Sequence, residues 1–191
     1  MHLILASSSP YRRMLLERLG LPFDTSSPAI DESALPEEAP AQTAERLSLE
    51  KARAVAAHHP SGLIIGSDQV AYLGPTCFGK PGTIDRAIEQ LTQMRGQTVI
   101  FHTGLALLNA RTGHTQVRGV PTQVRFRNLS DAEIRRYVER EMPLDCAGAA
   151  KVESLGITLL EALSGDDPTA LIGLPLIALS EMLRAEGLML P

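Results

Sequence analysis

Residues suited to phosphate chemistry are spread over the first 80 positions of the chain. They stand at the ends of apolar runs, in turns, or among apolar neighbours. Four cations, two carboxylates and two hydroxyls make up the set: Ser7, Ser9, Arg12, Arg13, Glu32, Lys51, Asp68 and Lys80. Cations neutralise charge on phosphate oxygens, carboxylates hold Mg²⁺, and one carboxylate can orient or deprotonate water. The set therefore predicts phosphate binding and metal-assisted attack by water.

A serine-rich turn opens the chain. The apolar run 3–5 predicts a buried strand, and the apolar spacing in 14–19 predicts a helix. Ser9 is placed to cap this helix and Pro10 to start it, where its missing N–H costs nothing. Free N–H groups, hydroxyls and the two arginines of the first turn suit a phosphate. An ordinary capped helix with solvated arginines explains the same spacing equally well.

Asp68 interrupts the apolar strand predicted over 63–73. A carboxylate on a buried strand is costly unless it is paired or binds a metal. Either Asp68 caps a turn or it is functional, and the cost of burial favours a functional role.

Lys80 ends a stretch that matches the first seven positions of a phosphate-binding P-loop, from Gly74 onward. The eighth position is Pro81, which offers neither a hydroxyl for Mg²⁺ nor an N–H. We therefore reject the P-loop and keep Lys80 as a cation on a tight turn. Neither His102 nor His114 has an acidic neighbour in the sequence with which to build a nucleophile.

Helices and strands must alternate to position these side chains. We expect helices over 41–57 (with Thr43 as its cap), 83–95, 130–142 and 175–185. We expect further strands over 98–108, 116–126 (broken at Pro121) and 157–160, and loops over 35–40 and 145–153. The irregular alternation and the hairpin near 109–113 predict an α/β domain with a mixed sheet.

The composition limits the classes of protein to which the chain can belong. Its 191 residues suffice for one domain with a sizeable core, or for two small lobes. The net charge of −4 argues against a nucleic-acid binder but allows a small phosphorylated ligand. Cys77 and Cys146 form no CxxC pair, which fits a reducing cytoplasm. We expect no signal peptide and no membrane span.

Six motifs, in order along essentially the whole chain, point to a known family. They are Leu5-Ala6-Ser7-Ser8-Ser9-Pro10-Tyr11-Arg12-Arg13, Asp31-Glu32-Ser33, Glu50-Lys51-Ala52, Gly66-Ser67-Asp68-Gln69, Gly79-Lys80-Pro81 and Thr103-Gly104-Leu105. These motifs resemble the Maf-like nucleotide pyrophosphatases. The resemblance implies one domain over 1–191, with an elongated mixed sheet, flanking helices and two lobes around a cleft. This fold is similar to that of the inosine-triphosphate pyrophosphatases.

The resemblance also implies an activity: hydrolysis of a nucleoside triphosphate between the α and β phosphates, with Mg²⁺ or Mn²⁺. It makes Asp68 the proton acceptor, with Lys51 and Lys80 as catalytic cations. Glu32 and Asp68 are the expected metal ligands. The expected phosphate-binding residues are Ser7, Ser9, Arg12 and Arg13.

Three positions point to a branch of the family. The commoner branch of the family acts on dTTP and UTP. At the positions that Tyr11, Gln69 and Glu153 occupy in this chain, that branch usually has arginine, threonine and glutamine. The trio found here, with Cys146-Ala147-Gly148 ahead of Glu153, resembles the branch that hydrolyses 7-methyl-GTP. An aromatic face attracts the cationic methylated guanine, and a carboxylate accepts its N–H groups. Alternatively, Tyr11 packs on its helix and Glu153 is a surface residue.

The leading hypothesis is a cytoplasmic, Mg²⁺- or Mn²⁺-dependent pyrophosphatase that converts 7-methyl-GTP to 7-methyl-GMP and diphosphate. The second hypothesis keeps the same reaction but has dTTP, UTP or another modified nucleotide as the substrate. The third is a nucleotide-binding regulator of cell division with little turnover. We expect no nucleic-acid or membrane partner, and we leave a homodimer open.

Overall fold

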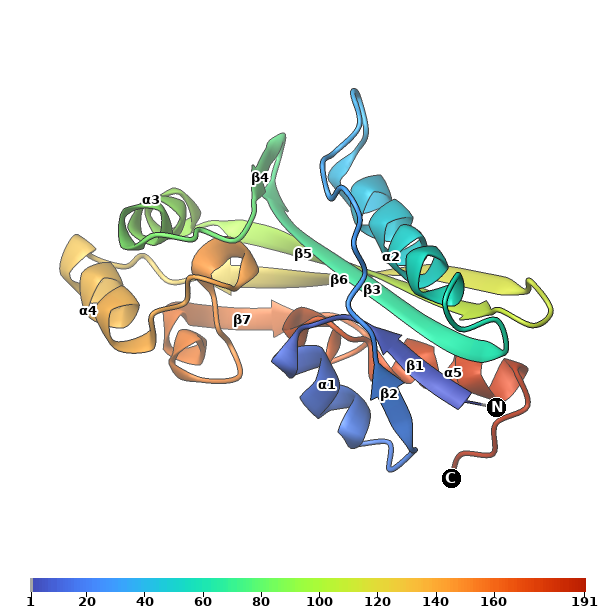
Figure 1. The fold of residues 1–191 in the computed structure, drawn as a ribbon. Helices are drawn as coiled ribbons and strands as arrows, with labels where there is room; N and C mark the ends of the chain where they lie inside the picture. The colour runs from blue at the N-terminus through green and yellow to red at the C-terminus, as the bar shows by residue number, and fades with distance from the viewer. Residues whose placement is uncertain (1) are drawn as a thin grey trace. The chain divides into compact units, whose positions relative to one another are not determined.

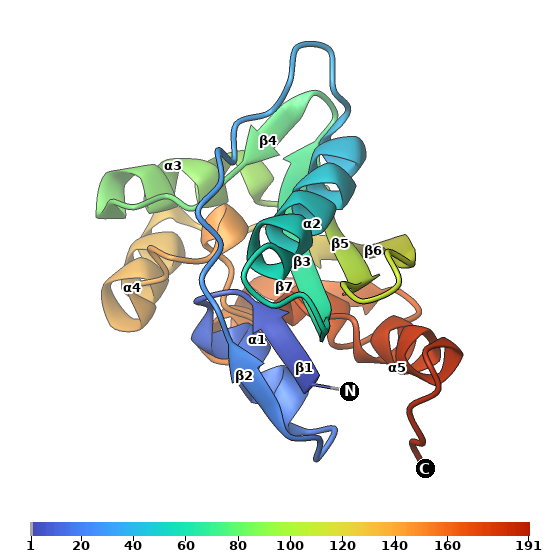
Figure 2. The ribbon, with the colours of Figure 1, turned by 45° about the vertical axis from the view of Figure 1, so that its right-hand side comes forward.

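The computed structural model describes residues 2–191 (Figures 1 and 2). The helices are α1 Pro10–Glu17, α2 Pro40–Ala56, α3 Ile84–Met94, α4 Asp131–Glu141 and α5 Leu176–Ala185. The strands are β1 His2–Ala6, β2 Phe23–Thr25, β3 Gly62–Leu73, β4 Thr76–Phe78, β5 Thr98–Asn109, β6 Thr115–Phe126 and β7 Leu160–Ser164. Short 3₁₀ helices cover Ala147–Ala149 (η1), Leu155–Leu159 (η2) and Ala170–Ile172 (η3). In the part of the chain described, no helix is both long and apolar enough to cross a bilayer.

The strands pair in the order β2-β1-β3-β5-β6-β7, and β4 pairs with β3. β1 is parallel to β2 and to β3, whereas β3–β4 and β6–β7 are antiparallel. The predicted α/β class with a mixed sheet and flanking helices is therefore confirmed.

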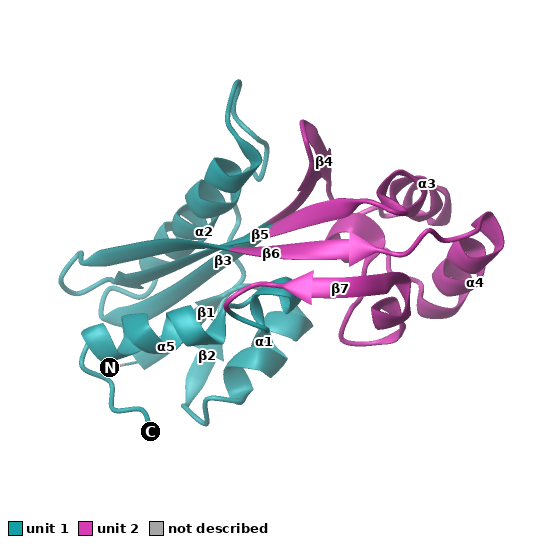
Figure 3. Ribbon diagram, turned by 180° about the vertical axis from the view of Figure 1, so that it is seen from behind, with its two compact units in different colours: residues 1–69, 102–120, 167–191 teal, residues 70–101, 121–166 magenta. Residues whose placement is uncertain are grey.

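The chain divides into two compact units, shown in teal and magenta in Figure 3. Unit 1 consists of residues 1–69, 102–120 and 167–191, of which residue 1 is outside the described range. Unit 2 consists of residues 70–101 and 121–166. The expected cleft between two lobes and the single domain over 1–191 stay predictions.

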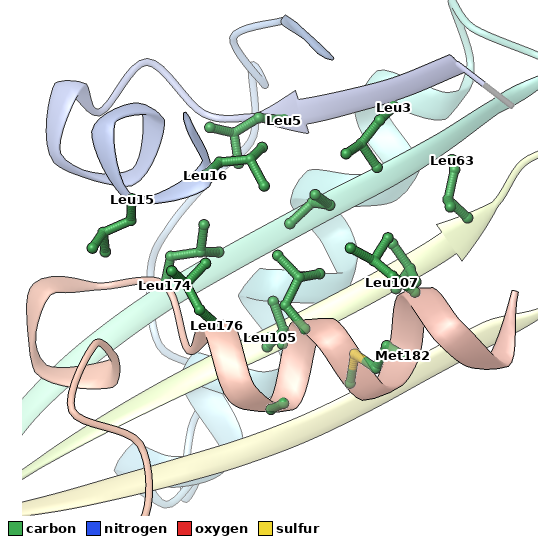
Figure 4. Close-up of a cluster of buried hydrophobic side chains, with 14 residues drawn as sticks. Leu3, Leu5, Leu15, Leu16, Leu63, Leu105, Leu107, Leu174, Leu176 and Met182 are labelled. Carbon is green, nitrogen blue, oxygen red and sulfur yellow. The ribbon is translucent and has the colours of Figure 1, made fainter. Parts of the chain in front are cut away.

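Unit 1 has apolar layers on both faces of its strands, because successive residues of a strand point to opposite faces. Leu3 and Leu5 join a cluster with α1 and α5, which Figure 4 shows from the side of α5. Ile4 and Ala6 join a second cluster with Ala52 of α2. Burial on both faces explains why these strands read as continuous apolar runs.

Two glycines bring α2 into direct contact with the sheet. A Cβ atom at Gly66 of β3 would overlap the carbonyl oxygen of Ser48, and one at Gly104 of β5 would overlap that of Ala44. Only glycine allows a helix backbone to approach a strand this closely. The approach fixes α2 against β3, where the predicted functional residues of both elements lie.

Unit 2 differs from the expectation in one strand. The predicted strand over 157–160 is wrong, because Leu155–Leu159 forms η2 and the strand begins only at Leu160. The N–H of Gly156 donates to the carbonyl of Lys151, and the Thr158 hydroxyl donates to the carbonyl of Leu155. These local bonds satisfy backbone groups that an extended chain would leave to a neighbouring strand.

Two smaller expectations are also wrong. Thr43 does not cap α2, because the helix begins at Pro40 with Ala39 as N-cap, and the Thr43 hydroxyl instead donates to Glu38. β6 continues through Pro121, which is exposed and precedes the first β6–β7 pair at Gln123. The β6–β7 ladder therefore needs no N–H from the proline.

Candidate active site

A buried lysine joins the two predicted carboxylates. Lys51 of α2 is 5% exposed, and its Nζ lies 2.5 Å from Oδ1 of Asp68 and 2.8 Å from Oε1 of Glu32. Asp68, on β3, is 8% exposed. The charge-assisted bond to Lys51 offsets the desolvation that made a carboxylate on this strand costly. Asp68 therefore belongs to a charged cluster and does not cap a turn.

The donor set suits a divalent cation held together with a substrate. Across residues 2–191, no group of three His, Cys, Asp or Glu side chains is arranged to hold a metal ion. Glu32 and Asp68 both contact the ammonium group of Lys51, however, and Mg²⁺ is commonly held by one or two carboxylates plus substrate phosphates and waters. The two residues fit such a shared site and do not fit an all-protein cage.

The serine turn folds as predicted. Ser9 caps α1, with its Oγ accepting from the N–H of Arg12 at 3.4 Å, and Pro10 is the first helical residue. The buried Ser7 Oγ accepts from the N–H of Ser9 at 3.1 Å and from Nη1 of Arg12 at 3.5 Å. Hydroxyls, N–H groups and one guanidinium thus gather at the N-terminus of α1.

The two arginines of α1 have different surroundings. Nε of Arg12 donates to the carbonyl of Gly173 at 2.8 Å. Burial lowers the pKa of Arg12, while the charges of Asp68 and Glu32 oppose that shift, so its guanidinium is electrostatically coupled to the Lys51 cluster. Arg13 is exposed and pairs with Glu17 at 3.1 Å. Consecutive helical residues do not share a face, which explains the divergence. A phosphate-binding role for Arg13 stays a prediction.

Gln69 contacts a turn that the sequence did not mark as functional. Its Nε2 donates to Oγ1 of Thr103 at 2.9 Å and to the carbonyls of Ala170 and Leu171 at 3.0 and 3.1 Å. Since Nε2 is engaged there, Oε1 is the Gln69 atom available to a ligand. The backbone carbonyls of Ala170 and Leu171 thus orient a residue predicted to read the base.

Ser67 is a residue that the prediction of the site missed. It is fully buried, and its Oγ lies 2.9 Å from the carbonyl of Gly104 and 2.8 Å from that of Gly173. The Gly173 carbonyl also accepts from Arg12, so one backbone oxygen connects β3 with α1. Gly173 has φ +111°, a conformation that favours glycine. The quoted motifs included Ser67 and Gly104, but sequence offered no sign that residues 170–173 would meet them.

Lys80 and Glu153 belong to unit 2. Lys80 is exposed, and its side chain forms no ion pair within the described residues. The loop around Lys80, between β4 and α3, is held by two bonds: the carbonyl of Gly79 accepts from the N–H of Gly148, and the N–H of Gly82 donates to the carbonyl of Leu144. The expected tight turn at Lys80 is wrong, because the turn lies at Gly74 and Pro75 between β3 and β4, and Lys80 stands in the loop that follows β4. A phosphate-binding role for Lys80 stays a prediction.

The segment that carries Glu153 is braced by α4. The hydroxyl of Tyr137 donates to the carbonyl of Ala149 and accepts from the N–H of Lys151, both at 3.0 Å. Nζ of Lys151 lies 3.1 Å from Oε1 of Glu141, and this hydrogen bond raises the pKa of Lys151. Glu153 is exposed as a whole, yet partial burial of its carboxyl group raises its pKa while the Lys151 charge opposes the shift.

His102 and His114, which have no acidic neighbour in the sequence, each contact a glutamate that is distant in the chain. Nε2 of His102 lies 3.0 Å from Oε1 of Glu45, and Nδ1 of His114 lies 2.5 Å from Oε1 of Glu186. Neither pair includes a residue of the candidate site. Tyr11, the remaining predicted base contact, is partly buried on α1.

Comparison with known proteins shows the family of the chain. The family model for Maf-like proteins matches residues 2–186. A 7-methyl-GTP pyrophosphatase of Aromatoleum aromaticum is 67% identical over 189 residues, which cover 99% of this chain and 97% of the relative. Proteins of the same name from Cupriavidus metallidurans and Thiobacillus denitrificans are 59% and 56% identical over 185 residues; these cover 97% of this chain and 93% and 92% of the relatives. The chain belongs to the family of Maf-like proteins.

Proposed function

We propose that this protein hydrolyses 7-methyl-GTP to 7-methyl-GMP and diphosphate, by adding water across the α–β phosphoanhydride bond. The observation that carries the proposal is the cluster of Lys51 with Asp68 and Glu32. A pure nucleotide binder has no need for a carboxylate that activates water. The names of the similar proteins support the choice of substrate.

In this mechanism Asp68 takes the proton from the attacking water. Its Oδ1 accepts from Lys51, so Lys51 orients the carboxylate and Oδ2 receives the proton. Glu32 and Asp68 are the residues that would hold a divalent cation beside the triphosphate. Such a cation supplies charge neutralisation on the phosphate oxygens when it is bound.

The triphosphate is held by cations and by the start of α1. Arg12 is partly buried and coupled to the carboxylates, which suits it to a non-bridging oxygen near the reacting phosphorus. The N-terminal turn of α1, with Ser7 and Ser9, supplies the further donors. Lys80 and Arg13 are exposed, and they are the further cations of this proposal for binding phosphate.

The base is read by Tyr11, Gln69 and Glu153. Methylation at N7 makes guanine cationic, so the face of Tyr11 attracts it. Glu153 accepts from the N1–H and the exocyclic amine, and Oε1 of Gln69 adds an acceptor because Nε2 is engaged by Thr103 and residues 170–171. The positive base favours an ionised Glu153, which opposes the effect of burial on its carboxyl group.

We further propose that the protein acts in the cytoplasm as one functional domain over 1–191, on free nucleotides and not on nucleic acid or membranes. Both cysteines are free thiols, which fits a reducing compartment. A homodimer stays an open alternative to a monomer, and sedimentation of the purified protein decides between them.

The test of the reaction is product analysis. Purified protein is incubated with 7-methyl-GTP and Mg²⁺ or Mn²⁺, and the products are separated and quantified. The proposal predicts equal amounts of 7-methyl-GMP and diphosphate, and no turnover when the metal is chelated. Orthophosphate with 7-methyl-GDP, or turnover that is insensitive to chelation, would contradict it.

A further inference from the structure

Glu32 lies on an exposed segment without helix or strand. Every residue from Asp31 to Glu37 is exposed. Such a segment gains little from apolar burial, and the entropy of the chain opposes any fixed position. Polar contacts must therefore supply the order that keeps the Glu32 carboxylate 2.8 Å from Lys51.

Arg46 of α2 holds this segment with its whole guanidinium group. Its Nε and Nη2 donate to the two carboxylate oxygens of Glu38 at 2.7 and 2.8 Å. Nη2 also donates to the carbonyl of Ser33 at 3.0 Å, and Nη1 to Glu50 at 3.0 Å. The paired bonds to Glu38 are the strong, bidentate kind that only arginine forms.

Glu38 extends the contact back into its own segment. Its Oε2 accepts from the N–H of Leu35 at 3.1 Å and from the hydroxyl of Thr43 at 2.9 Å. The side chains of Arg46 and Glu38 are only 20% and 10% exposed. The hydrogen bond from Arg46 lowers the pKa of Glu38 to about 2, so the pair is ionised throughout the neutral range.

From these contacts we propose that Arg46 and Glu38 are positioning residues, which hold Glu32 beside Lys51 for catalysis. The inference rests on the function proposed above. The Ser33 carbonyl that Arg46 binds belongs to the residue directly after Glu32. Arg46 and Lys51 are five residues, or about 1.4 turns, apart on α2. The same helix therefore binds the segment at two adjacent residues, Ser33 and Glu32.

If the ion pair of Arg46 and Glu38 only stabilises the fold, its loss should have different effects. It would change the stability of the fold and leave the rate per folded molecule unaltered. Positioning predicts a loss in the reaction itself, because displacement of a reacting group by about 1 Å can cost 10²-fold in rate. It also predicts weaker use of the metal, since Glu32 is a proposed ligand.

The experiment compares Arg46→Lys and Glu38→Gln with Arg53→Ala in the full-length protein. Lysine keeps the charge but cannot form the bidentate pair, and Glu38→Gln serves if Arg46→Lys fails to fold. Arg53 is an exposed arginine of the same helix outside the contacts described, which makes it the matched control. For the first two variants we expect kcat/KM for 7-methyl-GTP to fall about 10- to 100-fold. The Mg²⁺ concentration for half-maximal rate should rise, and the control should match the parent.

Hydrogen exchange of residues 31–38 gives a readout independent of turnover. The N–H of Leu35 is bonded to Glu38, so its exchange should quicken in Arg46→Lys and Glu38→Gln but not in Arg53→Ala. Unchanged exchange, or a loss of thermal stability with unchanged kinetics, overturns the proposal. If the parent hydrolyses no nucleotide while exchange still quickens, the proposed function fails and the holding role of Arg46 stands.

Discussion

Replacing Asp68 by asparagine tests the role of the cluster most sharply, because the change removes a charge without removing an atom position. The amide oxygen can still accept from Lys51, which lies 2.5 Å from Oδ1. What is lost is the second carboxylate oxygen as a proton acceptor. The expected fall in kcat is about 10²–10⁴, the contribution of a general base.

The stability cost should be smaller than the catalytic one. The amide oxygen still accepts from the Lys51 ammonium, and Lys51 keeps Glu32 at 2.8 Å as a charged partner, so no buried charge is left unpaired and the exchange costs roughly 1 kcal/mol. That corresponds to a melting temperature lower by about 2–4 °C for a chain of this size. The loss in kcat corresponds to about 2.7–5.4 kcal/mol of transition-state stabilisation. The two effects are therefore separable in one preparation.

The assay is diphosphate release from 7-methyl-GTP at saturating substrate, alongside a thermal melt. Asp131→Asn is the control, since it makes the same chemical change in an exposed aspartate that pairs with Arg95. The Asp131→Asn control should keep nearly the turnover and the melting temperature of the parent, because exposed ion pairs contribute little. A folded Asp68→Asn protein with turnover within a few-fold of the parent would refute Asp68 as the proton acceptor.

Further predictions concern Lys51 and Lys80, and the stability of the fold at low pH. Lys51→Ala and Lys80→Ala should each lower kcat by about 10²–10³. Only Lys51→Ala should also destabilise the fold, by about 3–5 kcal/mol, because it leaves the buried Asp68 without its cation. Equal melting losses, or an unaffected rate in either variant, would contradict these assignments. The pKa of Glu38 is lowered to about 2 in the fold, so its stabilisation is present above its unfolded pKa and is lost as pH falls toward 2. The difference in unfolding free energy between the parent and Glu38→Gln should therefore shrink between about pH 4.5 and 2; a constant difference in urea melts would count against the pair.

Local signals predicted the elements well where one short stretch decides the outcome. Ser9 followed by Pro10 predicted the start of α1, and the helix expected over 130–142 begins at Asp131, with Ser130 and Glu133 as its capping box. The apolar run at 157–160 led to a wrong strand prediction, because Gly156 and Thr158 form local hydrogen bonds that the pattern of apolar residues does not reveal. Short apolar runs are ambiguous for this reason.

The sequence nominated the residues of the candidate site but not the contacts between them. The cost of a buried carboxylate singled out Asp68, and the structure gave it Lys51 as its partner. The bond from Arg12 to Gly173 joins residues far apart in the chain, and no local pattern in the sequence signals it. Likewise, Arg12 and Arg13 look equivalent as neighbours, and only the packing of α1 distinguishes them.

The measurement that tests the central claim most directly is the ratio of kcat/KM for 7-methyl-GTP to that for UTP and dTTP, in the parent and in Glu153→Gln. A glutamine at this position presents one acceptor and an opposed NH₂ to two guanine donors, a mispairing that costs about 1–3 kcal/mol. We expect the parent to prefer 7-methyl-GTP, and Glu153→Gln to lower the ratio by about 5- to 150-fold. A parent that prefers UTP or dTTP, or a ratio unmoved by the substitution, would contradict the account.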